Sequence, residues 1–139
     1  MPDHQSMPQP GEILGPLEIE ITAERVHAYA DAGGDHNPIH IDAAFAETSS
    51  FGGPIAHGML LLAYLARVLT ARFGRSWVET GSLEARFRNP AHVGSRVVVR
   101  GEVQGISAGP AGSVVTCALH CEDSAGQILV AATAKLTCV

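Results

Sequence analysis

Cysteine is scarce in this sequence, and its number is odd. Only Cys117, Cys121 and Cys138 are present, and an odd number of thiols is typical of a reducing compartment rather than of a disulfide framework. If Cys117 and Cys121 share a strand, they lie roughly 13 Å apart, because a strand rises about 3.3 Å per residue. A disulfide between these two thiols is therefore excluded.

Basic residues are few and scattered. Nine Lys and Arg residues stand against fourteen Asp and Glu residues, which gives a formal net charge of −5. A main partner such as nucleic acid or an anionic membrane surface requires a basic patch, so this balance argues against both. We expect any phosphate contact to be local.

Long apolar segments are also missing. The longest apolar run, residues 59–66, is far shorter than the ~20 residues needed to cross a bilayer. Residues 1–10 are polar, contain three prolines and lack the apolar core of a signal peptide. These features predict a cytoplasmic protein.

What the chain does contain is enough apolar sequence for one folded domain. It has 139 residues, 46% of them hydrophobic, which fits a single compact domain with a core. Residues 1–11 are interpreted as a flexible N-terminal arm, and residues 12–139 as the domain.

Hydrophobic periodicity divides this domain into helices and strands. The expected elements are a strand near 13–21, a helix after Thr22 that ends at Gly33 and Gly34, a short helix over 42–48, a long helix from Gly58 to Gly74, and strands near 83–87, 96–100, 115–121 and 128–136. The long helix is apolar all round, so we expect it to be buried on most sides. Short glycine-containing connections at 89–94, 105–112 and 123–126 favour antiparallel pairing of successive strands. The pattern predicts an α+β fold in which one antiparallel sheet wraps over a central helix.

Two groups that can transfer protons, Asp35 and His40, lie five positions apart in a polar stretch. Asn37 and Pro38 form a turn-favouring pair, and the proline prevents an ordinary helix from running through the stretch, so these two residues shape a loop. An Asp and a His in one loop can hold a water and move its protons. Alternatively, Asp35 caps a turn and His40 is a hydrogen-bonded loop histidine, and residue types alone leave both interpretations open.

His57 and Gly58 add a second feature at the start of the apolar helix. Free backbone N–H groups and the helix dipole at such a position can stabilise a negatively charged oxygen. Glycine also lets a ligand approach the backbone closely. The alternative is an ordinary helix start assisted by glycine.

A metal site is not expected. His36, His40 and His57 do not have the HExxH spacing that places two ligands on one helix. Cys117, His120 and Cys121 would point to opposite faces of a strand and would not converge on an ion.

Three segments together resemble the MaoC-like (R)-specific enoyl-CoA hydratases. They are Gly34-Asp35-His36-Asn37-Pro38-Ile39-His40, Ile55-Ala56-His57-Gly58-Met59-Leu60 and Phe87-Arg88-Asn89-Pro90-Ala91-His92-Val93-Gly94. The resemblance extends from about Ile13 to the C-terminus. It implies a hot-dog fold, in which a curved antiparallel sheet wraps around a long helix, and usually a homodimer with its site near the subunit interface.

The resemblance also implies an activity, the reversible addition of water to a trans-2-enoyl thioester. Asp35 and His40 would then be the catalytic dyad that binds the water, and the Gly58 N–H would polarise the thioester carbonyl. Asn37 and Pro38 would shape the loop, with His57 in a supporting role. No metal and no cofactor is implied, because the acyl-CoA is the substrate.

One residue departs from the family pattern, and three alternative functions also fit the sequence in part. Some members that accept short acyl chains carry a serine eight residues after the glycine, where this chain has Ala66. The first alternative is the catalytic subunit of a hetero-oligomeric 3-hydroxyacyl-acyl-carrier-protein dehydratase, although no docking surface for a carrier protein can be identified. The second is a thioesterase, which usually has a carboxylate on the central helix, whereas residues 58–73 contain none. The third is a non-catalytic acyl-binding subunit, against which the intact Asp35 and His40 argue.

Overall fold

The computed structural model describes residues 6–138; residues 1–5, which belong to the expected flexible arm, and residue 139 lie outside the described residues. The strands are β1 (Ile13–Glu20), β2 (Ser82–Phe87), β3 (Arg96–Gly109), β4 (Gly112–Asp123) and β5 (Ile128–Cys138). The helices are α1 (Ala23–Gly33), α2 (Pro38–Ile41), α3 (Ala43–Glu47), α4 (Gly58–Phe73) and α5 (Arg75–Thr80). The strands form one antiparallel sheet in the order β1-β3-β4-β5-β2. The expected α+β fold is confirmed.

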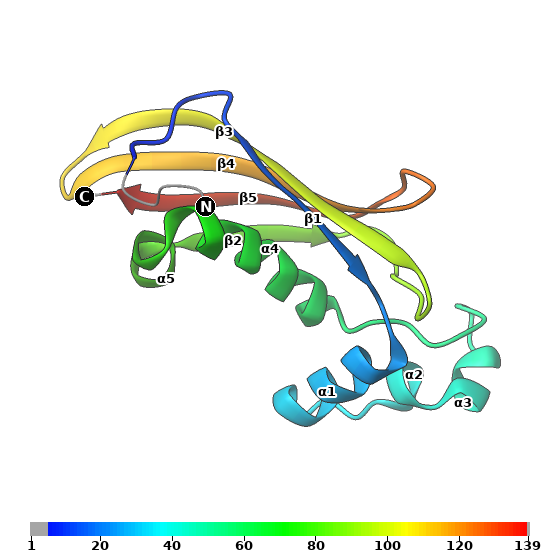
Figure 1. Cartoon of the computed structure of the whole chain (residues 1–139). Helices are drawn as coiled ribbons and strands as arrows, with labels where there is room; N and C mark the ends of the chain where they lie inside the picture. Colours follow the sequence, from blue (N-terminus) through cyan, green and yellow to red (C-terminus); the bar gives the residue numbers. More distant parts are fainter. Residues whose placement is uncertain (1–5, 139) are drawn as a thin grey trace.

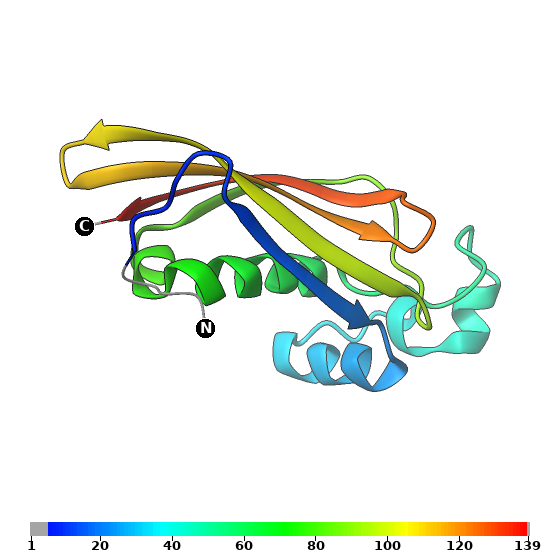
Figure 2. The same ribbon diagram turned by 45° about the horizontal axis from the view of Figure 1, so that its top comes forward.

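The sheet curves over α4, and the short helices gather at one end of that helix. Figure 1 shows α4 lying along the concave face of the sheet, with α1, α2 and α3 beyond its N-terminal end and α5 at its C-terminal end. The second view shows the same arrangement (Figure 2). The layout brings the loop between α1 and α2 towards the start of α4.

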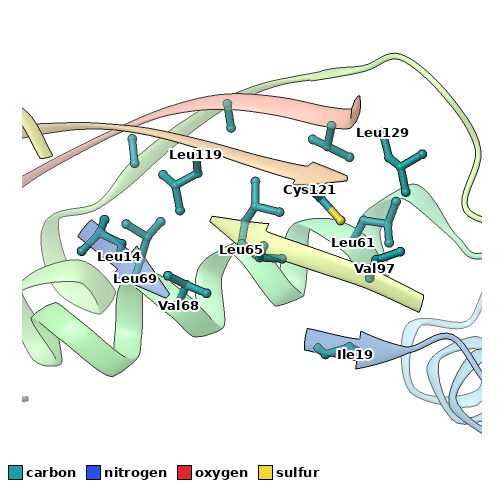
Figure 3. Close-up of a cluster of buried hydrophobic side chains, with 14 of the residues drawn as sticks. Leu14, Ile19, Leu61, Leu65, Val68, Leu69, Val97, Leu119, Cys121 and Leu129 are labelled. Atoms are coloured by element: carbon teal, nitrogen blue, oxygen red, sulfur yellow. The ribbon is translucent and has the colours of Figure 1, made fainter. Parts of the chain in front are cut away.

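The hydrophobic core lies between α4 and the sheet. Leu61, Leu65 and Leu69 recur at helical spacing on the side of α4 that faces the strands, and Leu65 and Leu69 are fully buried (Figure 3). Burying a leucine side chain contributes roughly 1.5–3 kcal/mol. The other side of α4 is not covered, since Met59 is 58% exposed and Arg67 is also exposed. The exposed residues of α4 form a single stripe and the remaining positions are buried or half-buried, so the prediction that this helix is buried on most sides is confirmed for the described chain.

The two-residue period correctly identifies the inward faces of β4 and of β5 from Val130 onward, but it fails at the start of β5, where Leu129 is fully buried and Ile128 is only half-buried because the pairing with β4 shifts register there. The buried residues on these faces are Val115, Cys117, Leu119 and Cys121 on β4 and Val130, Ala132, Ala134 and Leu136 on β5. Thr133 and Lys135, which alternate with them, are exposed. Phe87 at the end of β2 is an exception, because its ring is largely exposed although the period predicts an inward position.

The pairing of β2 differs from the prediction. The short connection after it suggests a hairpin with β3, but β2 pairs with β5 instead. The segment that connects β2 to β3 pairs instead with the chain before α4. The Ala56 N–H donates to the Ala91 carbonyl at 2.8 Å, and the Val93 N–H donates to the Pro54 carbonyl at 2.9 Å. These bonds anchor the chain immediately before α4.

The connection expected over 105–112 is much shorter than predicted. β3 continues to Gly109 and β4 begins at Gly112, so only residues 110 and 111 separate them. Residues 105–109 match the G-x-S-x-G pattern of hydrolase nucleophile elbows, but they lie within β3 and no helix follows them. Ser107 is therefore not placed as such a nucleophile. Helix α5 is not among the predicted elements, which pass directly from the long helix to the strand near 83–87.

The described part of the expected arm contacts the domain. Pro8 is buried, and the Gly11 N–H donates to the Val103 carbonyl at 2.7 Å. Arg72 donates to the Ser6 carbonyl at 3.1 Å and forms a two-point ion pair with Glu12. The division of the chain at residue 11 stays a prediction. Within residues 6–138, none of the helices is long and apolar enough to span a membrane.

Candidate active site

The loop after α1 is built by backbone and side-chain turns. Gly34 ends α1 in the left-handed region with φ 71°, a conformation that glycine adopts at little cost. Asp35 Oδ1 accepts the Asn37 N–H at 3.2 Å, and Asn37 Oδ1 accepts the Ile39 N–H at 3.1 Å. Pro38 follows as the first residue of α2. An N–H at this position has no partner within the helix, so its absence in proline costs no hydrogen bond. The stretch predicted as a loop thus contains one helical turn after Asn37.

His40 lies on that turn and is held by a backbone carbonyl. Its Nδ1 donates to the Ile55 carbonyl at 2.8 Å, because a carbonyl oxygen can only accept. In the neutral ring, Nε2 therefore carries the lone pair, and it faces Asp35 Oδ2 at 3.9 Å. This distance is too long for a direct hydrogen bond. The His40 side chain is 12% exposed and that of Asp35 is 54% exposed, so two acceptor atoms face each other at the edge of solvent.

His57 ties the loop to the start of α4. Its Nε2 donates to the Asp35 backbone carbonyl at 2.9 Å, and its ring stacks on the His40 ring with centroids 3.8 Å apart. The Tyr29 ring contacts the same imidazole at 4.8 Å between centroids. His57 is only 2% exposed, and its Nδ1 is buried with no hydrogen-bond partner among residues 6–138. In the neutral ring the proton must therefore be on Nε2, where its acceptor lies.

Gly58 is the first residue of α4, a 16-residue helix. The first N–H groups of a helix have no partner within it. The N–H groups of Leu60 and Leu61 bond the His57 carbonyl, whereas the Gly58 N–H has no acceptor in the part of the chain that the structure describes. The Phe87 ring packs over the glycine so closely that a β-carbon there would lie 2.8 Å from its Cε1.

A cavity of about 350 Å³ borders Gly58. Its walls are largely apolar and include Phe51, Ile55, Leu61 and Phe87. Asp35 and His40 do not line this cavity, but Ile55, whose carbonyl holds His40, does. The cavity and the loop therefore meet at the segment that leads into α4.

The structure brings most of the expected site residues together. One ligand atom from each of Asp35, His40 and His57 lies within 4.8 Å of the others, a spacing that would also suit a metal ion. His36 is not in this group, because its Nε2 contacts Asp31 at 2.9 Å. The absence of a metal stays a prediction.

Sequence reasoning missed Tyr29 as a site residue. Its place in the helix after Thr22 gives no indication of the contact with His57, which is distant in sequence. Phe87 was also missed, although it belongs to one of the three segments that carried the resemblance. The indication of a role is that its exposed ring lines the cavity beside Gly58, which only the structure shows.

Comparison with known proteins identifies the family. A family model described as MaoC like domain matches residues 6–123. The 3-hydroxyacyl-thioester dehydratase Z of Mycobacterium tuberculosis is 35% identical over 129 residues, covering 87% of this chain and 85% of that protein. An (R)-specific enoyl-CoA hydratase of Aeromonas caviae is 36% identical over 88 residues, covering 63% of this chain and 65% of that protein.

A solved structure agrees in fold over nearly the whole chain. The (R)-hydratase from A. caviae involved in PHA biosynthesis superposes with a TM-score of 0.83 at 27% identity, covering 97% of this chain and 99% of that one. The hot-dog fold expected from the resemblance is thereby confirmed. Together with the match over residues 6–123, this places the chain in the family of MaoC-like domains.

Proposed function

We propose that the chain is an (R)-specific enoyl-CoA hydratase, which in reverse is a 3-hydroxyacyl thioester dehydratase. Relatives carry both names, and the two names describe one hydro-lyase reaction in opposite directions. The observation that carries the proposal is the 3.9 Å gap between two acceptor atoms, Asp35 Oδ2 and His40 Nε2. The proposed enzyme needs no metal or other cofactor and works in the cytoplasm.

A water molecule fits the chemistry of that gap. Water can donate one hydrogen to the ionised carboxylate and the other to the Nε2 lone pair, which leaves its oxygen free to attack C3 of the enoyl chain. Neither Asp35 nor His40 carries a proton to donate to the substrate at the start. The pair therefore takes one proton from the water and delivers that same proton to C2. Hydroxyl adds to C3 and hydrogen to C2, so the reaction balances without an external acid.

Gly58 has the electrophilic role in this proposal. Attack at C3 places negative charge on the thioester oxygen, and an N–H with no other acceptor at the start of a helix stabilises such an oxyanion. The lack of an acceptor on the Gly58 N–H within residues 6–138 supports this role. The apolar cavity beside Gly58 would receive the acyl chain.

His57 supports the dyad without exchanging protons with substrate. Its hydrogen bond fixes the backbone of Asp35, and its ring fixes the plane of His40. Asn37 and Pro38 set the turn between the two catalytic residues. We expect each of these three to act through position alone.

The carrier is proposed to be CoA. A specific alternative is the catalytic subunit of a hetero-oligomeric 3-hydroxyacyl-acyl-carrier-protein dehydratase, and the name of the M. tuberculosis relative specifies a thioester without naming a carrier. A thioesterase is not favoured, because α4 contains no carboxylate. Ala66, on α4, replaces a serine found in some members that accept short chains, so substrate length must be measured.

The test is a hydration assay with the unaltered protein. The loss of enoyl absorbance is followed with trans-2-enoyl-CoA substrates of increasing chain length, and the 3-hydroxy product is resolved by chirality. We expect hydration with the R product. Hydration with the S product would contradict the assignment, as would no reaction at any chain length.

A further inference from the structure

Arginine side chains gather beside the cavity at Gly58. Arg88 follows Phe87 at the end of β2 and lines that cavity. It also lines a second cavity of about 610 Å³, to which Arg86 and His120 contribute. The two cavities therefore share Arg88 as a common wall.

The two arginines have no side-chain partner in the part of the chain that the structure describes. Within residues 6–138, neither Arg86 nor Arg88 forms an ion pair or a side-chain hydrogen bond, and both are exposed. The arginines that do form ion pairs are Arg72, Arg75 and Arg100. One carboxylate, Glu84, lines the second cavity, so two guanidinium groups stand against one acid there. This is a local positive excess on a chain with a net charge of −5.

The position of these charges matches the shape of the proposed substrate. Suppose that the thioester carbonyl is at the Gly58 N–H and that the acyl chain fills the apolar part of the cavity. The pantetheine arm then leaves past the residues of the cavity wall that the acyl chain does not cover. Arg88 is the only charged residue on those walls among the described residues. The carrier end of the substrate is anionic, and guanidinium groups bind phosphate oxygens through paired N–H donors.

We propose that Arg86 and Arg88 form a binding subsite for the phosphate groups of CoA. This inference rests on the proposed function and deepens it by naming the residues that bind the carrier. CoA has a diphosphate and a 3′-phosphate, whereas a phosphopantetheine arm on a carrier protein has a single phosphate. The shared chemistry is a phosphate ester next to pantetheine, and the additional phosphates distinguish CoA.

The experiment compares three butenoyl thioesters that differ in phosphate content. They are trans-2-butenoyl-CoA, the corresponding 4′-phosphopantetheine thioester and the corresponding N-acetylcysteamine thioester, which has no phosphate. The variants are Arg86→Gln, Arg88→Gln and the double variant that carries both changes. In the double variant we expect KM for the CoA thioester to rise roughly 10-fold or more. We expect kcat/KM for the N-acetylcysteamine thioester to be unchanged.

The matched control is Arg96→Gln. Arg96 is exposed, has no ion pair within residues 6–138 and lines neither cavity, so this variant removes the same charge elsewhere. We expect its KM for the CoA thioester to equal that of the unaltered chain. If Arg96→Gln raises KM as much as the double variant, net charge explains the effect and the subsite is refuted.

The three substrates separate the possible outcomes. A loss with the CoA thioester alone assigns the arginines to the diphosphate or the 3′-phosphate. An equal loss with the phosphopantetheine thioester assigns them to the phosphate next to pantetheine, which a carrier protein shares, and this refutes the commitment to CoA. An equal loss with all three thioesters, or no loss with any, overturns the subsite.

A binding measurement separates this inference from the proposed function. Free CoA is titrated calorimetrically into the unaltered protein and into the double variant at low and at physiological salt. We expect the double variant to bind CoA at least ~10-fold more weakly at low salt, because surface ion pairs are screened as salt rises. Arginine-dependent CoA binding without hydration would refute the proposed function alone, and equal binding by both proteins would refute the subsite alone.

Discussion

At the scale of single residues, two touching imidazole rings have opposite hydrogen-bond assignments. His40 donates from Nδ1 to the Ile55 carbonyl, which leaves Nε2 as an acceptor. His57 instead donates from Nε2 to the Asp35 carbonyl, which leaves a buried Nδ1 with no partner among residues 6–138. A histidine is suited to the second position because it combines a donor with a flat ring. Phenylalanine offers only the ring, and glutamine offers only the donor.

The proposed role of His57 can be tested by separating these two properties. We expect His57→Phe and His57→Gln each to lower kcat while KM changes little, because the dyad loses its alignment and the cavity beside Gly58 is untouched. His57→Ala should lower kcat further than either. Steady-state kinetics with an enoyl-CoA provide the measurement, and thermal unfolding identifies any variant that has lost its fold. An unchanged kcat in His57→Ala would contradict the positioning role.

At the scale of elements, the sequence predicts local periodicity better than it predicts pairing. The inward residues of β4, and those of β5 from Val130 onward, follow from alternation alone, because side chains on a strand alternate between faces. The partner of β2 does not follow, since a short connection normally favours a hairpin. Here that connection hydrogen-bonds to residues 54–56, a contact that no local pattern encodes.

The same limit applies to the site. The spacing from Asp35 to His40 is visible in the sequence, as is the glycine at the start of α4. The stacking of His40 on His57 is not, because it joins residues 17 positions apart through the packing of α2 against the segment before α4. The resemblance of the three motifs to a known family placed His40 and His57 in one site, which hydrophobic periodicity could not do.

Strand β4 contains two buried thiols that make stability depend on pH. Burial raises the pKa of Cys117 to about 11 and that of Cys121 to about 12, from an ordinary value of 9.0. Above pH 9 the unfolded chain loses thiol protons that the folded chain keeps, so the unfolded state binds fewer protons and stability falls as pH rises. The slope approaches about 1.4 kcal/mol per thiol for each pH unit.

Urea unfolding at pH 8 and pH 10 measures this dependence. We expect the free energy of unfolding to fall between the two pH values in the unaltered chain and to fall less in the Cys117→Ala, Cys121→Ala double variant. The double variant will be less stable at pH 8, so the quantity to compare is the change with pH. An identical change in both proteins would show that these thiols are not the cause.

At the scale of the whole molecule, one side of α4 and several large apolar side chains are exposed. Ile13, Met59, Val78 and Phe87 are among the exposed large hydrophobic residues of the described chain. Exposed apolar surface of this kind is typical of an interaction site. We therefore propose that the chain works as a homodimer, which fits the symmetry of most soluble oligomers.

Light scattering at micromolar concentration measures the molar mass in solution. A chain of 14.5 kDa is expected to give twice that mass. A monomer would contradict the proposal and would favour the alternative in which this chain is one subunit of a hetero-oligomer. A variant with a charged residue in place of Met59 is expected to form a weaker dimer than the unaltered chain.

The central claim is that Asp35 and His40 together hold and deprotonate the attacking water. The most direct measurement is turnover of trans-2-butenoyl-CoA by Asp35→Asn and His40→Gln, with His36→Gln as the matched control because His36 contacts Asp31 outside the site. We expect each dyad variant to lose at least ~100-fold in kcat, the range for removing a general acid or base, and the control to keep its activity. Full turnover in either dyad variant would contradict the claim.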